Sequence, residues 1–274
     1  MTHNIHICNI LSGDLWAGAE VMVWNLLKKL MKFHDIKVSV ILMNNGRLAD
    51  LLNKNQLIAA IYDERNLSFG TALLSIRSFF RRNPPHVIHA HRYKENILGF
   101  LAGNAGRHAT RLVATQHGMP EPGPKRFLSF HHLIARLNRY LLRRRFDRLV
   151  VVSRDMIEKT YNDLGFSPER TVTIHNGIEL PELLAQFRPG PEIIVGSAGR
   201  LFPVKDYGLM VKIASQCSQN SPIRFTLAGD GPERTGIEDS VKACGVEDSF
   251  ALPGNVVEME SFYNRLDLYI NTSL

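Results

Sequence analysis

Short runs of β-branched and apolar residues alternate with longer amphipathic stretches along this chain, and the alternation constrains the fold more than any other feature. The apolar runs lie at residues 5–11, 37–44, 58–63, 87–91, 111–118, 148–153, 171–178, 192–200, 224–231, 249–254 and 266–273. Helical patterns lie between them, as at 19–32, 71–82, 206–219 and 233–244. Apolar strands separated by helices are typical of a parallel sheet covered on both faces. The sequence therefore predicts the α/β class with doubly wound parallel sheets.

A break in this pattern lies at residues 180–192, where three prolines and Gly190 disfavour both helix and strand. The charge balance changes there as well. Up to Arg188 there are 26 Lys and Arg against 15 Asp and Glu, and after it 7 against 11. We predict an N-terminal Rossmann-like domain over 1–180, a linker over 181–191 and a C-terminal Rossmann-like domain over 192–274. The second has about four strands, fewer than such domains usually contain, so we expect it to be incomplete.

The composition fits a globular protein, since 45% of the 274 residues are hydrophobic and 22% are charged. The three cysteines are far apart and form no C-x-x-C pair, which argues against a disulfide framework and a zinc site. The first residues do not resemble a signal peptide, and no apolar stretch approaches the roughly 20 residues that span a bilayer. These features predict a cytoplasmic protein.

Ligands of doubly wound sheets bind at the carboxyl ends of the strands, so the loops there are the candidate sites. The first is the glycine-containing loop 12–20, which leads into a helix whose N-terminus could hold an anion; an ordinary connection is the alternative. The second is the stretch GRLFPVKD (199–206), in which Arg200 and Lys205 flank a stiff turn. Two cations near a helix N-terminus suit a diphosphate, and a solvated surface pair is the alternative. The stretch AGDGPE (228–233) does not complete a dinucleotide fingerprint.

Histidines gather at the ends of two predicted strands. His89 and His91 face the same way on one strand and could serve a metal, but the sequence offers no third ligand nearby, so local packing or hydrogen bonding is favoured. His117 ends another strand, where it would project toward an interdomain cleft. No motif for a P-loop or for nucleophilic hydrolysis is present. We therefore expect neither a metal nor a cofactor.

The stretch 124–148 carries eight Lys and Arg against one acid and predicts a basic amphipathic helix near 126–146. On a helical wheel its apolar residues share one face: Phe127, Phe130, Leu133, Ile134, Leu137, Tyr140 and Leu141. The arginines that we expect to contact an anionic membrane are Arg136, Arg139, Arg143 and Arg144. A core-packed helix with a solvated basic face is the alternative. No nucleic-acid-binding motif accompanies the charge.

Taken in order, several short stretches resemble the landmarks of retaining glycosyltransferases with the GT-B fold, in particular the family 4 and group 1 enzymes. They are AGAE (17–20), VIHAH (87–91), QHG (116–118), VVSRDM (151–156), IHNGI (174–178), GRLFPVKD (199–206), LAGDGPER (227–234), LPGNV (252–256) and LDLYINTS (266–273). The resemblance covers nearly the whole chain. It implies two Rossmann-like domains facing across a cleft, the first for the acceptor and the second for a nucleotide-sugar donor.

In the C-terminal domain the resemblance implies a donor site without metal or cofactor. Arg200 and Lys205 look like the pair that neutralises the donor diphosphate and the leaving nucleoside diphosphate. Gly254, Asn255 and Val256 match the loop whose backbone reads the nucleobase.

In the N-terminal domain Gly18 looks like the glycine whose backbone approaches the same phosphates. His117 resembles the family histidine that contacts the transferred sugar. The sequence departs from the family pattern in two places. Ala17 stands where the family often has glycine, and the family continues after the position of Ser273 into a loop and helix bearing two glutamates seven residues apart. We therefore expect a chain truncated before that motif, which binds nucleotide sugars weakly or not at all.

The leading hypothesis is transfer of a sugar, with retained configuration, from a nucleoside diphosphate to a glycan or lipid-linked acceptor, as in polysaccharide or glycolipid synthesis. A second hypothesis is an inactive nucleotide- or membrane-binding fragment of such an enzyme, peripheral at the cytoplasmic membrane face. A third is a sugar-nucleotide epimerase or a phosphorylase, for which fewer motifs match.

Overall fold

The computed structural model describes residues 5–13, 16–103, 109–118, 130–179, 190–217 and 222–273. The chain divides into two compact units, unit 1 over Met1–Leu180 and unit 2 over Pro181–Leu274, and each is described by itself. Most of the predicted linker 181–191 lies outside the described residues.

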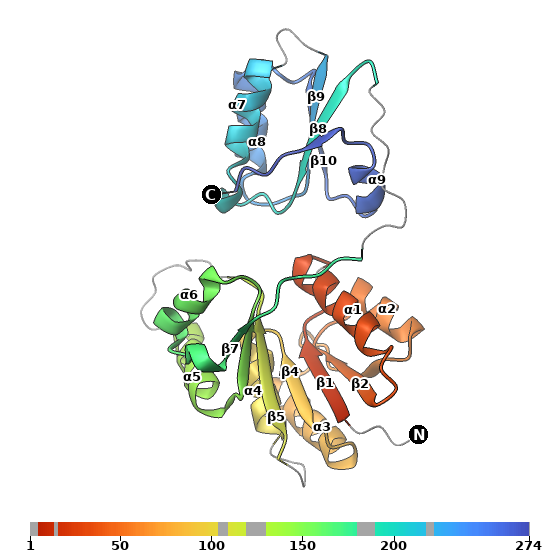
Figure 1. Cartoon of the computed structure of the whole chain (residues 1–274), viewed down its shortest axis with the longest axis vertical. Helices are drawn as coiled ribbons and strands as arrows, with labels where there is room; N and C mark the ends of the chain where they lie inside the picture. The colour runs from red at the N-terminus through yellow and green to blue at the C-terminus, as the bar shows by residue number, and fades with distance from the viewer. Residues whose placement is uncertain are drawn as a thin grey trace. The chain divides into compact units, whose positions relative to one another are not determined.

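Unit 1 is built on a seven-stranded sheet in the order β3-β2-β1-β4-β5-β6-β7, and all of its strand pairs are parallel (Figure 1). Its strands are β1 (Ile5–Leu11), β2 (Ile36–Leu42), β3 (Ile58–Ile61), β4 (Val87–Ala90), β5 (Arg111–Gln116), β6 (Arg148–Val151) and β7 (Thr171–Thr173). Its helices are α1 (Gly18–Leu30), α2 (Arg47–Lys54), α3 (Phe69–Arg82), α4 (Tyr93–Gly103), α5 (Phe130–Arg145) and α6 (Asp155–Leu164), with a 3₁₀ turn at Pro168–Arg170.

Apolar side chains bury both faces of this sheet. One core contains Val23 and Leu27 of α1 and Leu48 of α2, together with Val40 and Leu42 of β2. The other contains residues from α3 to α6, among them the fully buried Phe80 and Phe146. Helices α1 and α2 therefore cover one face and α3 to α6 the other (Figure 1). This is why the central strands read as apolar along their length.

Unit 2 repeats the same winding on a smaller scale. Its parallel sheet has the order β10-β9-β8-β11, in which β8 (Ile193–Ala198) and β9 (Ile223–Ala228) are central. The remaining elements are β10 (Phe250–Gly254), β11 (Leu268–Tyr269), α7 (Tyr207–Cys217), α8 (Arg234–Ala243), α9 (Met259–Tyr263) and a 3₁₀ turn at Pro203–Lys205. Helices α7 and α8 share one core, and α9 lies on the other side of the sheet (Figure 1).

The two sheets confirm the predicted α/β class and parallel winding. Two of the predicted strands form over less than half of their expected length. The run 171–178 pairs only through Thr173, because the chain then leaves the sheet and is held by side chains of α1: Lys28 and Lys29 both bind Glu179. The run 266–273 pairs only at Leu268 and Tyr269. Residues beyond a strand end form loops, which is where ligands bind in this architecture.

Candidate functional site

Each sheet has one point where the strand order reverses, between β1 and β4 in unit 1 and between β8 and β11 in unit 2. Strands β1 and β4 pair directly, as Ile7 does with Val87 and Ile10 with Ala90. The helices that follow two such strands leave toward opposite faces, so a crevice opens beyond their carboxyl ends. Among the candidate residues predicted from the sequence, Gly18 comes after β1, and Arg200 and Lys205 come after β8.

In unit 1 a buried carboxylate links the loops that follow β1 and β4. Glu20 is 2% exposed, and its Oε2 accepts a hydrogen bond from the backbone N–H of Ala17 at 3.2 Å. Its Oε1 binds the guanidinium of Arg92 at 2.8 Å. Glu20 thus fixes the first turn of α1, where an acid also complements the helix dipole. Next to it, a Cβ on Gly18 would meet no described atom within 4 Å, so there is room for a side chain at this position.

A second buried carboxyl group lies at the same edge. Glu95, in the first turn of α4, is 1% exposed and accepts a hydrogen bond from Ser12 Oγ at 2.9 Å. Burial raises the pKa of Glu95, and the hydrogen bonds that it accepts from its own backbone and from Ser12 oppose the shift. Its Oε2 has no partner within the described part of the chain. This group therefore favours the protonated form more than an ordinary glutamate does.

Three histidines from the ends of β4 and β5 form a cluster. The rings of His89 and His91 are 4.3 Å apart, and His89 Nε2 lies 2.7 Å from Thr115 Oγ1. His91 Nδ1 lies 3.0 Å from His117 Nε2, and His91 Nε2 lies 3.4 Å from Oδ1 of the buried Asn9. His89 and His91 are thus both engaged in local hydrogen bonds.

Burial keeps this cluster uncharged. It lowers the pKa of His89 to about 4, with His117 as a smaller cause. It also lowers the pKa of His117 to about 4, to which the positive charge of Arg92 adds. The pKa of His91 falls well below its usual value for the same main reason. All three imidazoles are therefore neutral near pH 7, and each has one donor and one acceptor nitrogen.

In unit 2 the predicted cations lie in the loop after β8. Lys205 Nζ is 3.3 Å from Ser273 Oγ, and the backbone carbonyl of Lys205 accepts a hydrogen bond from Thr272 Oγ1 at 2.7 Å. The loops that follow β8 and β11 are thus joined at the point where the strand order reverses. Arg200 places its guanidinium over the ring of Phe202, 4.8 Å from the centroid. Lys205 forms no ion pair with any residue that the structure describes.

The glycines of the stretch 228–233 allow close packing of neighbouring loops. A Cβ on Gly229, whose φ is +137°, would overlap the carbonyl oxygen of Gly199. A Cβ on Gly231 would lie 2.5 Å from the carbonyl oxygen of Leu201. These glycines therefore serve the contact between the ends of β8 and β9, which accounts for them without a dinucleotide fingerprint.

Gly254 is the last residue of β10, and Asn255 and Val256 follow it at the same edge of the sheet. Gly254 has a φ of +79°, and its carbonyl oxygen accepts a hydrogen bond from the N–H of Gly229 at 2.7 Å. The loop after β10 is in this way tied to the loop after β9. The structure thus connects the predicted donor-site segments of unit 2 through backbone hydrogen bonds.

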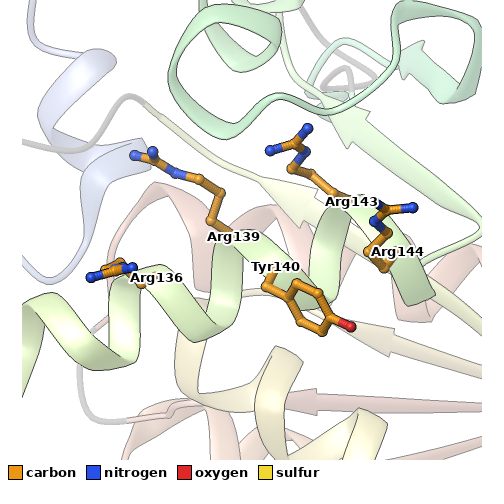
Figure 2. Close-up of a pocket in the computed structure, with 5 residues that line it drawn as sticks. All are labelled: Arg136, Arg139, Tyr140, Arg143 and Arg144. Carbon is orange, nitrogen blue, oxygen red and sulfur yellow. The ribbon is translucent and has the colours of Figure 1, made fainter.

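The four predicted membrane-contact arginines lie together on α5. Arg136, Arg139, Arg143 and Arg144 are all exposed and, with Tyr140, line a hollow of about 250 Å³ (Figure 2). None of the four forms an ion pair within the described ranges.

The apolar face predicted for this helix is divided in the structure. Leu141 packs into the core and Ile134 against it, whereas Leu133, Leu137 and Tyr140 are 64%, 43% and 55% exposed. The buried side is set by α4, because Asn138 accepts a buried hydrogen bond from Asn96 at 3.0 Å. Phe127 and the side chain of Phe130 lie outside the described residues.

Among the described residues no group of three or more His, Cys, Asp or Glu side chains is arranged so that it could hold a metal ion. In the same ranges no helix is both long and apolar enough to cross a membrane. Sequence reasoning did not single out Arg92, Glu95 or Asn9. Charged residues directly after β4 were a usable signal, whereas Asn9 lies inside an apolar strand and offers none.

Two parallel sheets wound in this order, with cations and histidines at the strand ends, place the protein in the GT-B class. Solved structures agree with this fold. HepE of Anabaena, crystallised in complex with UDP-glucose, has a TM-score of 0.75 at 19% identity, over 98% of this chain and 74% of that one. The lipopolysaccharide glycosyltransferase WaaG has a TM-score of 0.67 at 11% identity, over 98% and 75%.

The sequence assigns the family. Residues 16–182 match the model of Glycosyltransferase Family 4, and residues 184–274 match that of Glycosyl transferases group 1. The chain belongs to Glycosyltransferase Family 4. It is 24% identical to EpsF of Bacillus subtilis over 98% of this chain and 73% of that protein. It is 22% identical to the GPI3 subunit of the Saccharomyces cerevisiae phosphatidylinositol N-acetylglucosaminyltransferase, of whose length it spans 62%.

Proposed function

We propose that this protein is a retaining glycosyltransferase that moves a sugar from a nucleoside diphosphate to a glycan or lipid-linked acceptor. The observation that carries the proposal is the placement of Lys205 at the reversal point of the unit 2 sheet. This cation has no carboxylate partner among the described residues, it lies beside Ser273, and it follows a strand end where ligands of this architecture bind. HepE, a structural relative, was crystallised with UDP-glucose.

The proposed chemistry places negative charge where the cations lie. When the bond between the sugar and the diphosphate breaks, charge builds up on the leaving diphosphate. Arg200 and Lys205 stabilise that charge, Arg200 being suited to bidentate contact and Lys205 to a point contact. Gly254, Asn255 and Val256 present backbone groups to the nucleobase. The leaving phosphate assists the incoming hydroxyl on the same face of the sugar, so no protein nucleophile is required.

In unit 1 we assign two residues to the same reaction. Gly18 is the first residue of α1, where backbone N–H groups favour an anion, and we assign its backbone to the donor phosphates. His117 contacts the transferred sugar as a neutral imidazole, since its pKa is about 4.

Binding of UDP and GDP by the whole chain, followed by NMR titration, tests the diphosphate site. We expect weak binding that weakens further, by about 10- to 100-fold, in Lys205→Ala and in Arg200→Ala, because a hydrogen bond to a charged group contributes about 1.5–3 kcal/mol. Lys212→Ala and Arg265→Ala remove exposed charges of unit 2 and are the matched controls. Unchanged affinity in both site variants would refute the assignment. Anomeric NMR of a product formed from a nucleotide sugar tests retention.

We further propose that α5 contacts an anionic membrane. The exposed Leu133, Leu137 and Tyr140 lie at spacings of four and three residues, so they form one stripe along the helix. The four exposed arginines flank it, and Figure 2 shows Tyr140 among them. An apolar stripe beside cations that form no ion pair with the residues described suits the boundary between headgroups and acyl chains.

Co-sedimentation with vesicles tests this contact. Each arginine near an anionic surface contributes about 1 kcal/mol, so reversing Arg139, Arg143 and Arg144 to Glu should weaken binding to phosphatidylserine-containing vesicles more than 100-fold. The control reverses the exposed charges of Lys54, Arg81 and Arg82 instead. Equal binding to vesicles with and without phosphatidylserine would leave α5 with only its core-packing role.

A further inference from the structure

His91 connects His117 to the buried amide of Asn9. His91 is 5% exposed and Asn9 is fully buried, so neither exchanges freely with water. The rings of His91 and His117 have centroids 5.3 Å apart and planes inclined by 24°. With 3.0 Å between Nδ1 and Nε2, the two rings meet edge to edge through these nitrogens. Such a contact needs one proton between two nitrogens, held by one ring and accepted by the other.

The position of each proton follows from Asn9, the last residue in this series of hydrogen bonds. In this amide orientation Asn9 presents Oδ1 to His91 Nε2 at 3.4 Å and leaves its Nδ2 without a partner among the described residues. Because a carbonyl oxygen only accepts, this orientation places the hydrogen on Nε2 of His91. His91 is neutral, and its Nδ1 is therefore an acceptor. His117 Nε2 must then donate to it. Nδ1 of His117 is left as a lone pair with no partner among the residues described.

We propose that His91 is a positioning residue, which together with Asn9 holds His117 in the Nε2–H tautomer and in one ring orientation. A free imidazole can exchange donor and acceptor between its two nitrogens, and a ring that does so offers a substrate hydroxyl the wrong partner part of the time. Fixing the tautomer removes that choice before substrate arrives. The inference rests on the proposed contact of His117 with the transferred sugar.

The neighbours of the pair do not compete for its proton. His89 packs on the ring of His91, but its Nε2 is engaged by Thr115 Oγ1 at 2.7 Å. The guanidinium of Arg92 is held by Glu20, and its charge lowers the pKa of both His91 and His117. Burial and the positive charge of Arg92 both keep His91 and His117 neutral, which the single shared proton requires.

Nitrogen NMR of the whole chain with ¹⁵N-labelled histidine tests the inference, because protonated and unprotonated ring nitrogens resonate far apart. At pH 7 we expect both His91 and His117 to be protonated at Nε2 alone. In His91→Phe, which keeps a ring but removes the acceptor, His117 should populate both tautomers. In His91→Gln, whose amide oxygen can accept, the Nε2–H form should return. His89→Gln is the matched control and should leave His117 unchanged.

Protonation of His117 at Nδ1 in the unsubstituted chain, or an unaltered tautomer in His91→Phe, would overturn the inference. Should His91→Phe fail to fold, the tautomers of the unsubstituted chain decide alone. In a transfer assay His91→Phe should lower kcat about 10- to 100-fold, with a smaller effect on the KM for donor and recovery in His91→Gln. The NMR measurement needs no turnover, so it separates this inference from the transferase activity.

Discussion

Gly229 offers a direct test of how the strand-end loops of unit 2 are held together. Its N–H donates to the carbonyl of Gly254, and the neighbouring Ala228 carbonyl accepts from Gly199. In Gly229→Ala the new methyl group would overlap the carbonyl oxygen of Gly199 and lie 2.9 Å from its carbonyl carbon. Both atoms belong to the backbone, so no side-chain rotation can relieve the contact. The φ of +137° also disfavours any residue with a Cβ.

The expected cost has two parts. A residue with a Cβ in such a sparsely populated backbone region costs about 1–3 kcal/mol. Overpacking against fixed neighbours costs about another 1–3 kcal/mol. Folded domains are stable by only about 5–15 kcal/mol, so roughly 2–6 kcal/mol removes a large share of the stability of unit 2. Gly236→Ala is the matched control: Gly236 lies inside α8, its Cβ would meet nothing within 4 Å, and alanine should stabilise the helix by up to about 1 kcal/mol.

The two units can be followed separately during urea unfolding. Both tryptophans, Trp16 and Trp24, lie in unit 1, so their fluorescence reports that unit alone. Hydrogen exchange of α7 and β9, read by mass spectrometry, reports unit 2. Gly229→Ala should move the exchange transition to lower urea and leave the fluorescence transition in place. A loss below about 1 kcal/mol in unit 2 would refute the argument that backbone packing requires glycine here.

Three further outcomes are expected. Lys28 and Lys29 lower the pKa of Glu179 to about 2, so the stabilisation from this contact is present above the usual carboxyl pKa and is lost as pH falls toward 2. The hydrogen-exchange protection of the segment ending at Glu179, taken relative to the intrinsic exchange rate at each pH, should therefore fall from pH 6 to pH 3, and Glu179→Gln should show the low protection already at pH 6. Phe80→Ala empties a fully buried site and should cost unit 1 about 3–5 kcal/mol, measured by the tryptophan transition. Burial raises the pKa of the Cys8 thiol to about 12, so iodoacetamide at pH 8 should leave it unmodified until the chain is denatured, as mass spectrometry can determine.

The predicted strands gave the fold class because their signal is local. Each apolar run could be recognised from its own residues, and alternation with helices fixed the parallel direction. The same reasoning placed Arg200 and His117 at strand ends and Lys205 just before a helix, and the structure has them there. It gave less for α5, because a helical wheel cannot tell which part of a broad apolar face meets a neighbour. The position of α4 decided that Leu141 is buried and Leu137 is exposed.

What the sequence by itself determined is the order of elements and the residues at their ends, since periodicity and turn residues act over a few positions. What only the tertiary structure decided is which of these ends meet. Glu20 and Arg92 are 72 residues apart in the chain, and His91 and His117 are 26 apart. They come into contact because β1, β4 and β5 are neighbours in the sheet. Strand order depends on the packing of the whole unit, and it is strand order that assembles the candidate site.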